Sequence, residues 1–362
     1  MDFISKEEKV NLSMRRLYEL YGYTKYRMNK FEEYSFYLQN KNFLEHDRYI
    51  TFNDADGRLM ALKPDVTLSI VKNASTDGGN QRIYYSESIF RTGKGSKEFA
   101  ELRQTGLEFI GSIDICSTVE VLSLALKTLG ILSPSYVLSL SHMGIISRVL
   151  DGLDYKLKRR ITACLKGKNR HELEKLCLEA ALDEDTRSTL LALVGIRGGI
   201  DKGVEALLNM DRVRDLPAVK ELCRINDAFK DTEFYDHIQL DFSQVSSTEY
   251  YNGILLSGFV EGVATEVLTG GRYDNLLERM GKQGMQAMGF AVNFCFMEQL
   301  LRREQSNKYC AVLYDETTDA GYLCSVLERI TSQGRAVRAF NKEQYNGDCQ
   351  EVLDISGGRR AE

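Results

Sequence analysis

The hydrophobic and polar positions of the first 140 residues switch repeatedly between a helical period and a strand period. Apolar residues from Val10 to Tyr21 recur three or four positions apart, as on one face of an amphipathic helix. Shorter runs rich in β-branched and aromatic residues follow, and the turn sequence Asp54 to Gly57 is expected to join two of them into a hairpin. The predicted helices cover residues 6–21, 66–72 and 116–129, and the predicted strands cover 23–28, 48–53, 58–62, 81–91, 102–110 and 136–140.

The middle of the chain has a different pattern, dense in leucine and charged residues. Residues 155–230 carry helical repeats interrupted by Gly198, Gly199 and Pro217, which predicts an all-helical insertion. Strand patterns then return, so the sheet is expected to resume after the insertion. The later elements are predicted as strands at 238–242, 254–259 and 264–268, an apolar stretch at 287–301, and a final strand, helix and strand at 309–314, 319–333 and 336–340.

These elements predict an α+β fold with one large antiparallel sheet, helices and a small α/β domain at the end. The expected divisions are a core of residues 1–154 and 231–304, the insertion 155–230 and a tail 305–362. A content of 43% hydrophobic and 27% charged residues is typical of a folded globular protein. The sequence contains no run of 18 apolar residues, and its first residues do not resemble a signal peptide, so a cytoplasmic location is expected.

Charge and cysteine content narrow the possible functions. The formal net charge of −5 counts against tRNA binding, because nucleic-acid affinity comes largely from basic surfaces that release phosphate counterions. The eight cysteines contain no Cys-x-x-Cys pair, and we expect buried thiols rather than disulfides or a zinc site. The four histidines are far apart in the sequence. We therefore expect neither a metal nor a cofactor.

Four separated segments resemble the histidyl-tRNA synthetases, which are class II aminoacyl-tRNA synthetases. They occur in the same order between about residue 6 and residue 300, although any one segment alone is a weak signal. The resemblance implies a class II synthetase-like core followed by a shortened, anticodon-binding-like tail. The segments are Leu62 to Thr67, similar to a Leu-Arg-Pro-Glu-Gly-Thr stretch; Phe90 and Arg91 with Arg103 to Gly111, similar to motif 2; Glu249 to Asn252, similar to the end of Arg-Gly-Leu-Asp-Tyr-Tyr; and Gly270 to Asp274 with Ala287 to Ala291, similar to the motif 3 region.

The resemblance implies that the amino-acid half of a synthetase site is retained. Asp65 and Thr67 are then expected to hold the ammonium group of histidine, and Arg91 and Gln104 its carboxylate. Glu108 would bind one ring nitrogen, since a carboxylate accepts a hydrogen bond from an N–H group. Tyr251 would bind the other nitrogen, with Tyr250 beside it. The implied histidine-binding residues are therefore Asp65, Thr67, Arg91, Gln104, Glu108, Tyr250 and Tyr251.

The departures from the family pattern all fall on the ATP half. Ser246 stands where the synthetases carry the first Arg of Arg-Gly-Leu-Asp-Tyr-Tyr, and a hydroxyl cannot replace that guanidinium. Phe296 stands in place of the motif 3 Arg that clamps the nucleotide phosphates. Gly93 stands in place of an acid that follows the motif 2 Arg. The resemblance therefore implies a protein that binds histidine without activating it and has no catalytic residues of its own.

Retention of the histidine half and loss of the ATP half is similar to the synthetase-like regulatory subunits of short-form ATP phosphoribosyltransferase. Ser141 to Ile145, with its His142, resembles a Gly-His-Val-Gly-Ile stretch of these subunits. This resemblance implies feedback control of histidine biosynthesis. The implied partners are L-histidine, the short-form catalytic subunit and a second copy of the chain in a homodimer within a hetero-oligomer, while tRNA and membranes are not expected.

Other interpretations remain open from the residues alone. Arg91 and Glu108 could pair across a hairpin, Asp65 could cap the helix after Pro64, and alternation along a strand would let only one of Tyr250 and Tyr251 face a cleft. Two other functions also remain, a working histidyl-tRNA synthetase and a synthetase-like amino-acid-binding protein with another task. A histidine-dependent pyrophosphate-exchange assay separates the working synthetase from the regulatory subunit.

Overall fold

A computed structural model describes residues 5–44, 48–76, 78–92, 98–246, 250–297, 309–347, 349 and 351–358. The chain divides into two compact units, Lys6–Cys295 and a smaller one of Phe296–Glu362 with Met1–Ser5. The insertion helices belong to the larger unit together with the sheet. The domain boundaries expected at residues 154, 230 and 304 stay predictions.

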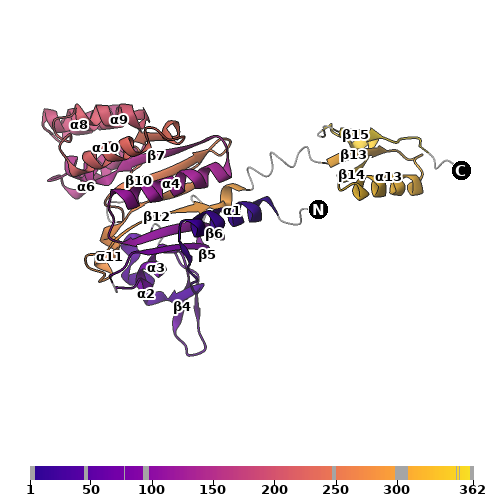
Figure 1. Ribbon diagram of the computed structural model, residues 1–362, viewed down its shortest axis with the longest axis horizontal. Coiled ribbons are helices and arrows are strands. Elements are labelled where there is room, and N and C mark those ends of the chain that lie inside the picture. Colours follow the sequence, from indigo (N-terminus) through magenta and orange to yellow (C-terminus); the bar gives the residue numbers. More distant parts are fainter. Residues whose placement is uncertain are drawn as a thin grey trace. The chain divides into compact units, whose positions relative to one another are not determined.

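The larger unit is built on a sheet of nine strands (Figure 1). Its central strands, from β5 to β7 in sheet order, are antiparallel, as predicted. Among the nine strands that the structure describes in this sheet, two neighbouring pairs are parallel. They are β1 with β5 and β7 with β9, toward the two ends of the sheet. In sheet order the strands are β1 (Thr24–Lys25), β5 (Gln81–Thr92), β6 (Phe99–Gly111), β12 (Gln286–Asn293), β11 (Leu268–Arg272), β10 (Ile254–Val260), β7 (Tyr136–His142), β9 (Ile238–Asp241) and β8 (Arg197–Gly199).

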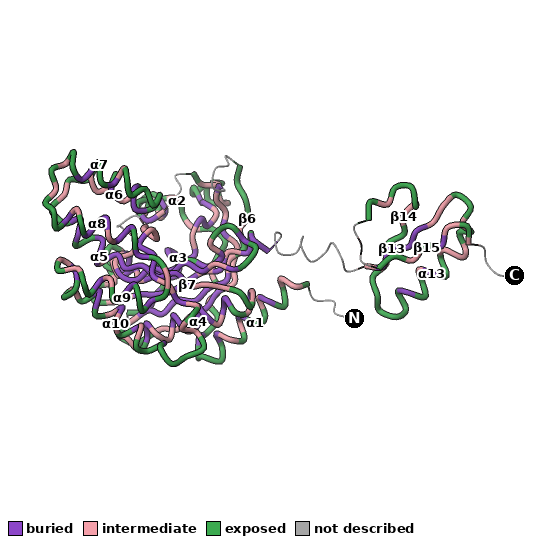
Figure 2. The backbone as a smooth tube through the Cα atoms, turned by 90° about the horizontal axis from the view of Figure 1, so that it is seen from above, coloured by how far each residue is buried: buried purple, intermediate pink, exposed green. Residues whose placement is uncertain are grey.

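One face of this sheet is covered by helices α1 (Lys6–Leu20) and α4 (Ile115–Leu132). Asp114 caps α4 by accepting a hydrogen bond from the Ser117 N–H group at 2.8 Å. Buried Tyr18 of α1 is hydrogen-bonded to Thr128 of α4 at 3.1 Å. Helix α4 is apolar and long enough to cross a membrane. However, 56% of its residues are buried inside the protein, where the helix packs against the sheet and neighbouring helices. Figure 2 shows the buried strands and the inner side of these helices at the centre of the unit.

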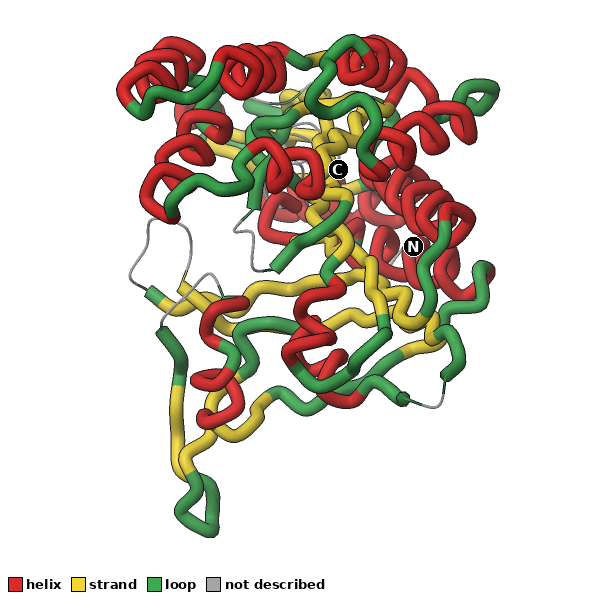
Figure 3. The backbone as a smooth tube through the Cα atoms, turned by 90° about the vertical axis from the view of Figure 1, so that its left-hand side faces the viewer, coloured by secondary structure: helices red, strands yellow, loops and turns green. Residues whose placement is uncertain are grey.

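The opposite face carries the shorter helices α2 (Tyr34–Gln39), α3 (Thr67–Asn73) and α11 (Asp274–Arg279). A small antiparallel sheet of β2 (Phe31–Glu33), β4 (Leu59–Leu62) and β3 (Thr51–Asn53) adjoins them. The hairpin predicted around Asp54 to Gly57 is therefore confirmed, and Figure 3 shows it extending away from the body of the unit. Buried side chains of α3 and α11 form one apolar cluster with those of β5 and β6 on this face.

The segment after β7 is mainly helical. Asp154, Asn169 and Asp183 each cap the helix that follows by accepting backbone N–H bonds. The prediction that residues 155–230 are all-helical is wrong at β8, where the pair of glycines extends as a sheet edge beside β9, with φ +114° at Gly198. The helices are α5 (Met143–Val149), α6 (Tyr155–Lys166), α7 (Arg170–Glu179), α8 (Glu184–Gly195), α9 (Ile200–Leu208) and α10 (Pro217–Phe229), with short 3-10 turns η1 (Lys41–Phe43), η2 (Tyr235–His237), η3 (Phe294–Phe296) and η4 (Lys342–Gln344) elsewhere.

The strand predicted at residues 264–268 is also misplaced. Strand β11 begins at Leu268 and runs through Gly270 and Gly271, beyond the end of the predicted strand. These glycines lie in the sheet because the neighbouring strands approach them closely. A Cβ atom on Gly270 would collide with the carbonyl oxygen of Gly289 in β12.

The smaller unit contains a three-stranded parallel sheet in the order β14, β13, β15. Strands β13 (Tyr309–Tyr314) and β14 (Ala336–Asn341) and helix α13 (Ala320–Ser332) agree with the predicted elements. The sequence pattern missed β15 (Glu351–Asp354), which is only four residues long. None of the eight cysteines forms a disulfide, and the expectation of buried thiols is confirmed for Cys164, Cys177 and Cys310. It is wrong for the other five, because Cys223 and Cys349 are half-buried and Cys116, Cys295 and Cys324 are exposed.

Candidate functional site

Glu108 is the only carboxylate among the buried polar side chains of β6, and it lies on the sheet face opposite α1 and α4. Its residue is 2% exposed. It pairs with Gly289 of β12, and a Cβ atom on that glycine would collide with the Glu108 Oε2 atom. Gly289 therefore provides the space that the Glu108 side chain occupies.

Two hydroxyl groups hold the Glu108 carboxyl group. The Thr67 hydroxyl donates to Oε1 at 3.2 Å and the Tyr273 hydroxyl donates to Oε2 at 2.6 Å. Burial raises the pKa of Glu108 to about 8. The hydrogen bonds from Tyr273 and Thr67 oppose this rise, and the nearby charge of Asp65 adds to it. Glu108 is therefore poised to gain or lose a proton near neutral pH, as carboxyl groups at functional sites often are.

An aromatic cluster of Tyr250, Tyr251 and Tyr273 adjoins this carboxyl group through the Tyr273 hydroxyl. The ring of Tyr250 lies 4.5 Å from that of Tyr251 and 5.7 Å from that of Tyr273, between ring centroids. The Tyr251 ring lies over Gly271, where a Cβ atom would be 2.9 Å from Tyr251 Cδ1. Burial raises the pKa of Tyr250 well above its ordinary value, and the charge of Asp65 raises it further. Tyr250 and Tyr251 lie before β10 and not within a strand. The rule that neighbouring strand residues point to opposite faces therefore does not apply to them.

Asp65 has a structural role and also lies beside the cluster. Its Oδ1 atom accepts a hydrogen bond from the Leu68 N–H group at 2.9 Å, which caps the first turn of α3. The capping role considered from the sequence is thus confirmed. The Asp65 charge also raises the pKa of Glu108 and Tyr250, so this carboxylate lies near both groups.

The structure places Gln104 and Arg91 farther from this cluster. Gln104 lies four residues before Glu108 on the same face of β6, about 13 Å along the strand. In the β5–β6 register Ile83 pairs with Glu108, whereas Arg91 pairs with Ala100. Arg91 is thus eight residues, about 26 Å, farther along the sheet than Glu108. The alternative that Arg91 and Glu108 pair across the hairpin is therefore wrong.

Two residues of this region were not singled out from the sequence. Tyr273 was noticed only as part of the Gly270 to Asp274 segment, yet its hydroxyl contacts Glu108. Lys63 is fully buried, and its ammonium group donates to Glu87 Oε2 at 3.2 Å. Glu87 pairs with Gln104 across the strands, so this ion pair lies between the Glu108 cluster and Arg91. Both residues lie inside segments that resemble the family, Lys63 in Leu62 to Thr67 and Tyr273 in Gly270 to Asp274. That position is the signal by which the sequence could have identified them.

The three departures on the ATP half differ in their surroundings. Ser246 is half-buried in the loop after β9. Phe296 is buried at the end of η3 and belongs to the smaller unit. Gly93 lies outside the described residues. Over the ranges that the structure describes, no group of three or more His, Cys, Asp or Glu side chains is placed to hold a metal ion.

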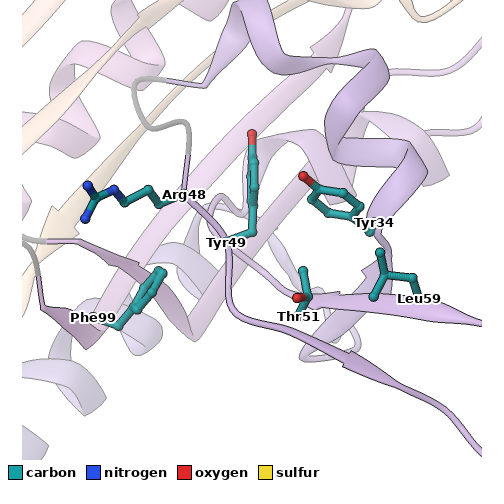
Figure 4. A pocket seen from close by; sticks show the side chains of 6 residues that line it. All are labelled: Tyr34, Arg48, Tyr49, Thr51, Leu59 and Phe99. Atoms are coloured by element: carbon teal, nitrogen blue, oxygen red, sulfur yellow. The ribbon is translucent and has the colours of Figure 1, made fainter.

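An open pocket of about 430 Å³ lies away from Glu108, beside the β3–β4 hairpin. Figure 4 shows Arg48 and Phe99 on one side of the Tyr49 ring and Tyr34 on the other. None of the seven predicted histidine-binding residues lines it, so we place the candidate site at Glu108 on chemical grounds. The pocket is lined by Tyr34, Arg48, Tyr49, Thr51, Leu59 and Phe99.

Comparison with known proteins gives the same two groups that the sequence motifs resemble. An ATP phosphoribosyltransferase regulatory subunit of Desulfitobacterium hafniense is 29% identical over 308 residues, covering 83% of this chain and 79% of the relative. A histidine–tRNA ligase of Methanocaldococcus jannaschii is 26% identical, covering 81% of this chain and 72% of the relative. The resemblance to the regulatory subunits is thus confirmed by relatives of comparable length.

Solved structures share the fold. An ATP phosphoribosyltransferase regulatory subunit/histidyl-tRNA synthetase from Bacillus halodurans has a TM-score of 0.69 and 20% identity, over 98% of this chain and 95% of that one. A chain of the ATP phosphoribosyl transferase (HisG:HisZ) complex of Thermotoga maritima has a TM-score of 0.63 and 17% identity, over 81% and 98%. The sequence profile of the histidyl-tRNA synthetases matches residues 2–295. This chain therefore belongs to the histidyl-tRNA synthetase family.

Proposed function

We propose that this chain is a non-catalytic regulatory subunit of ATP phosphoribosyltransferase that binds histidine at the Glu108 site. The observation that carries the proposal is a retained, buried Glu108 in a chain that has Ser246 in place of the activating arginine. The regulatory subunits among its relatives support the same assignment.

The chemistry of the cluster suits an imidazole ring. Glu108 presents two oxygen atoms that each already have one hydroxyl partner and retain further lone pairs. Tyr250 and Tyr251 supply flat apolar surface with hydroxyl groups at the edge. Asp65 supplies the negative charge that an α-ammonium group requires. Gln104 is the nearer candidate for the α-carboxylate, with Arg91 beyond it.

Regulation follows from a site that binds the end product of a pathway without consuming it. Histidine can inhibit the partner only if it binds the inactive assembly more tightly than the active one. A coupling of about 1–3 kcal/mol gives roughly 5- to 150-fold control, and the substrates of the partner must weaken histidine binding by the same factor. We propose a cytoplasmic assembly in which two copies of this chain form a homodimer that associates with the short-form catalytic subunit.

The test mixes the purified chain with a short-form catalytic subunit and follows phosphoribosyl transfer to ATP, with and without histidine. We expect the chain to co-purify with the catalytic subunit, to increase its rate and to make that rate sensitive to histidine. A chain that neither associates with the subunit nor changes its rate contradicts the regulatory assignment. It would favour an amino-acid-binding protein with another task.

A matched pair of variants separates the histidine site from general effects on assembly. Glu108→Gln removes the buried carboxyl group, whereas Glu101→Gln changes an exposed acid on the same strand. We expect Glu108→Gln to retain activation of the catalytic subunit but lose inhibition by histidine, and Glu101→Gln to retain both. Equal histidine sensitivity of the two variants contradicts the placement of the site.

A further inference from the structure

The hydrogen-bond network behind the tyrosine cluster is centred on Asp274. Its Oδ2 atom accepts from Arg272 Nε at 2.8 Å and from Asn252 Nδ2 at 3.3 Å, and Oδ1 accepts from a backbone N–H group of β12 at 3.1 Å. Asn252 Oδ1 in turn accepts from the Asp274 N–H group at 3.0 Å. Tyr251 directly precedes Asn252, and Tyr273 lies between Arg272 and Asp274. The network therefore fixes the backbone on which both tyrosines are mounted.

The same network reaches the end of β7. The Met143 N–H group donates to the Gly253 carbonyl oxygen at 2.8 Å, which ties the start of α5 to the segment after Asn252. The Arg272 side chain lies across Gly253, where a Cβ atom would be 2.9 Å from Arg272 Cβ and Cδ. Gly253 thus brings the first residue of α5 and the Arg272 side chain to one point of the backbone.

His142, the residue before Met143, connects this point to helix α10. The Gly144 N–H group donates to His142 Nδ1 at 3.1 Å, so the ring proton is on Nε2, which donates to Glu221 Oε2 at 3.1 Å. The residue His142 is 5% exposed. Burial acts to raise the pKa of Glu221, but the hydrogen bond from His142 and the nearby positive charge, including that of Arg272 and Arg224, together lower it. Glu221 of α10 is thus hydrogen-bonded to His142, and it lies near enough to Arg272 for that charge to lower its pKa.

We infer that Glu221, His142 and Arg272 are positioning residues through which helix α10 sets the tyrosine side of the amino-acid site. The identity of the ligand rests on the function proposed above, whereas the network itself does not. A displacement of α10 moves Glu221, which changes the hold on His142. Since the next residue, Met143, is bonded to the Gly253 carbonyl oxygen, the Tyr251–Gly253 segment follows. Since coupling between two sites is reciprocal, a ligand bound by the tyrosines must also stabilise the contacts of α10.

Three substitutions isolate this connection. In His142→Asn a short amide oxygen can still accept from the Gly144 N–H group, as in an Asx turn, but the side chain is too short to reach Glu221. Glu221→Ala removes the partner, and Glu221→Gln keeps an acceptor for His142 without the charge. Asp227→Asn is the control, because Asp227 is an exposed acid on the same helix.

Hydrogen exchange without histidine tests the network directly. The Asn252 and Met143 amides report on it, because they donate to the carbonyl oxygens of Arg272 and Gly253 at 3.1 and 2.8 Å. We expect both amides to exchange about tenfold faster in His142→Asn and Glu221→Ala, since local opening becomes easier. Asp227→Asn should match the wild type. Unchanged exchange in Glu221→Ala overturns the inference, whether or not the protein binds histidine.

Histidine affinity measured by calorimetry tests the effect on the site. We expect affinity to fall about fivefold or more in His142→Asn and in Glu221→Ala. The double variant His142→Asn with Glu221→Ala should bind histidine no more weakly than either single variant, because both substitutions break the same connection. Glu221→Gln should bind more tightly than Glu221→Ala, because it keeps an acceptor for His142. Wild-type affinity in Glu221→Ala overturns the inference. A wild-type protein that does not bind histidine overturns the proposed function instead, and the exchange result then decides on the network by itself.

Discussion

The Tyr273 hydroxyl donates a 2.6 Å hydrogen bond to Glu108 Oε2, although the two residues are 165 positions apart in the sequence. Strand β12 lies between β6, which carries Glu108, and β11, which Tyr273 directly follows. Gly289 of β12 leaves the space that the Glu108 side chain occupies. The carboxyl group is therefore oriented before any ligand arrives. A preoriented group loses less conformational entropy on binding, which favours affinity.

Removing the Tyr273 hydroxyl should weaken ligand binding without unfolding the protein. Tyr273→Phe keeps the ring but leaves Glu108 Oε2 without its donor, at a cost of about 1–3 kcal/mol. Because this bond lowers the pKa of Glu108, the variant should raise that pKa further. We expect calorimetry to show at least fivefold weaker histidine binding, whereas Tyr155→Phe, at a 70% exposed position, should bind like the wild type. Equal affinity of both variants contradicts a role for the Tyr273 hydroxyl.

The raised pKa of Glu108 predicts a specific pH dependence of stability. Between the ordinary value of 4.5 and the folded value of about 8, the folded protein holds one more proton than the unfolded chain. This contribution to stability is present below pH 4.5 and is lost as the pH rises through 8. Glu108→Gln does not titrate, so its free energy of unfolding relative to wild type should increase by about 2–4 kcal/mol from pH 5 to pH 8.

Urea unfolding of both proteins at a series of pH values measures this difference, and the comparison cancels the other titrating groups. Glu101→Gln serves as the control, because that residue is exposed. A constant difference between Glu108→Gln and wild type across this pH range shows that Glu108 has an ordinary pKa and contradicts the burial argument.

The proton on Glu108 should also determine how histidine affinity depends on pH. An unpaired charge is costly in a buried site, so we expect the complex to keep one proton shared between Glu108 and the imidazole ring. Free Glu108 holds that proton below about pH 8, and the ring of free histidine is neutral above about pH 6.5. Binding near pH 7.2 should therefore exchange no protons, and affinity should fall about tenfold per pH unit above 8.

Calorimetry in two buffers with different ionisation enthalpies checks this expectation at pH 7.2. Equal binding enthalpies in both buffers agree with a retained proton. Release of close to one proton means that Glu108 binds the ring as a carboxylate, and the shared-proton description is then wrong.

The sequence predicted the elements of the sheet better than the arrangement of the site. Alternation and turn residues located β5 and β6 within a few residues, because local chemistry decides where such strands begin and end. The strand predicted at residues 264–268 was misplaced, because β11 runs through Gly270 and Gly271, where glycine allows the close approach of a neighbouring strand. The sequence pattern did not identify Tyr273 for a related reason. Its contact with Glu108 depends on the order of strands in the sheet, which local patterns do not specify.

The buried ion pair of Lys63 and Glu87 should be a sensitive point for stability. Lys63→Met fills similar space but leaves Glu87, with 17% of its side chain exposed, without its partner. Breaking a buried pair costs up to about 3–5 kcal/mol, and the partial exposure of Glu87 should reduce this to about 2 kcal/mol. The double variant Lys63→Met with Glu87→Gln should recover most of the loss, since no unpaired charge remains. Urea unfolding checks both, and an equal loss in the double variant contradicts this explanation.

The last prediction concerns the missing ATP half of the synthetase site. The purified chain should show no histidine-dependent pyrophosphate exchange, because Ser246 offers a hydroxyl where the family uses a guanidinium to stabilise developing charge. Loss of one such donor typically costs about 10²–10³ in rate. Ser246→Arg should remain inactive, since Phe296 still stands where the phosphate-clamping arginine is found in the family.

The assay needs a control for traces of a host synthetase. Glu108→Ala prepared in the same way should lose histidine binding, so any exchange that it shares with the wild type comes from a contaminant. Exchange that is present in the wild type, absent in Glu108→Ala and saturable with histidine would mean that the chain activates histidine. The protein would then be a working synthetase with an altered ATP site, because a subunit that consumes its effector cannot report the effector's concentration at equilibrium.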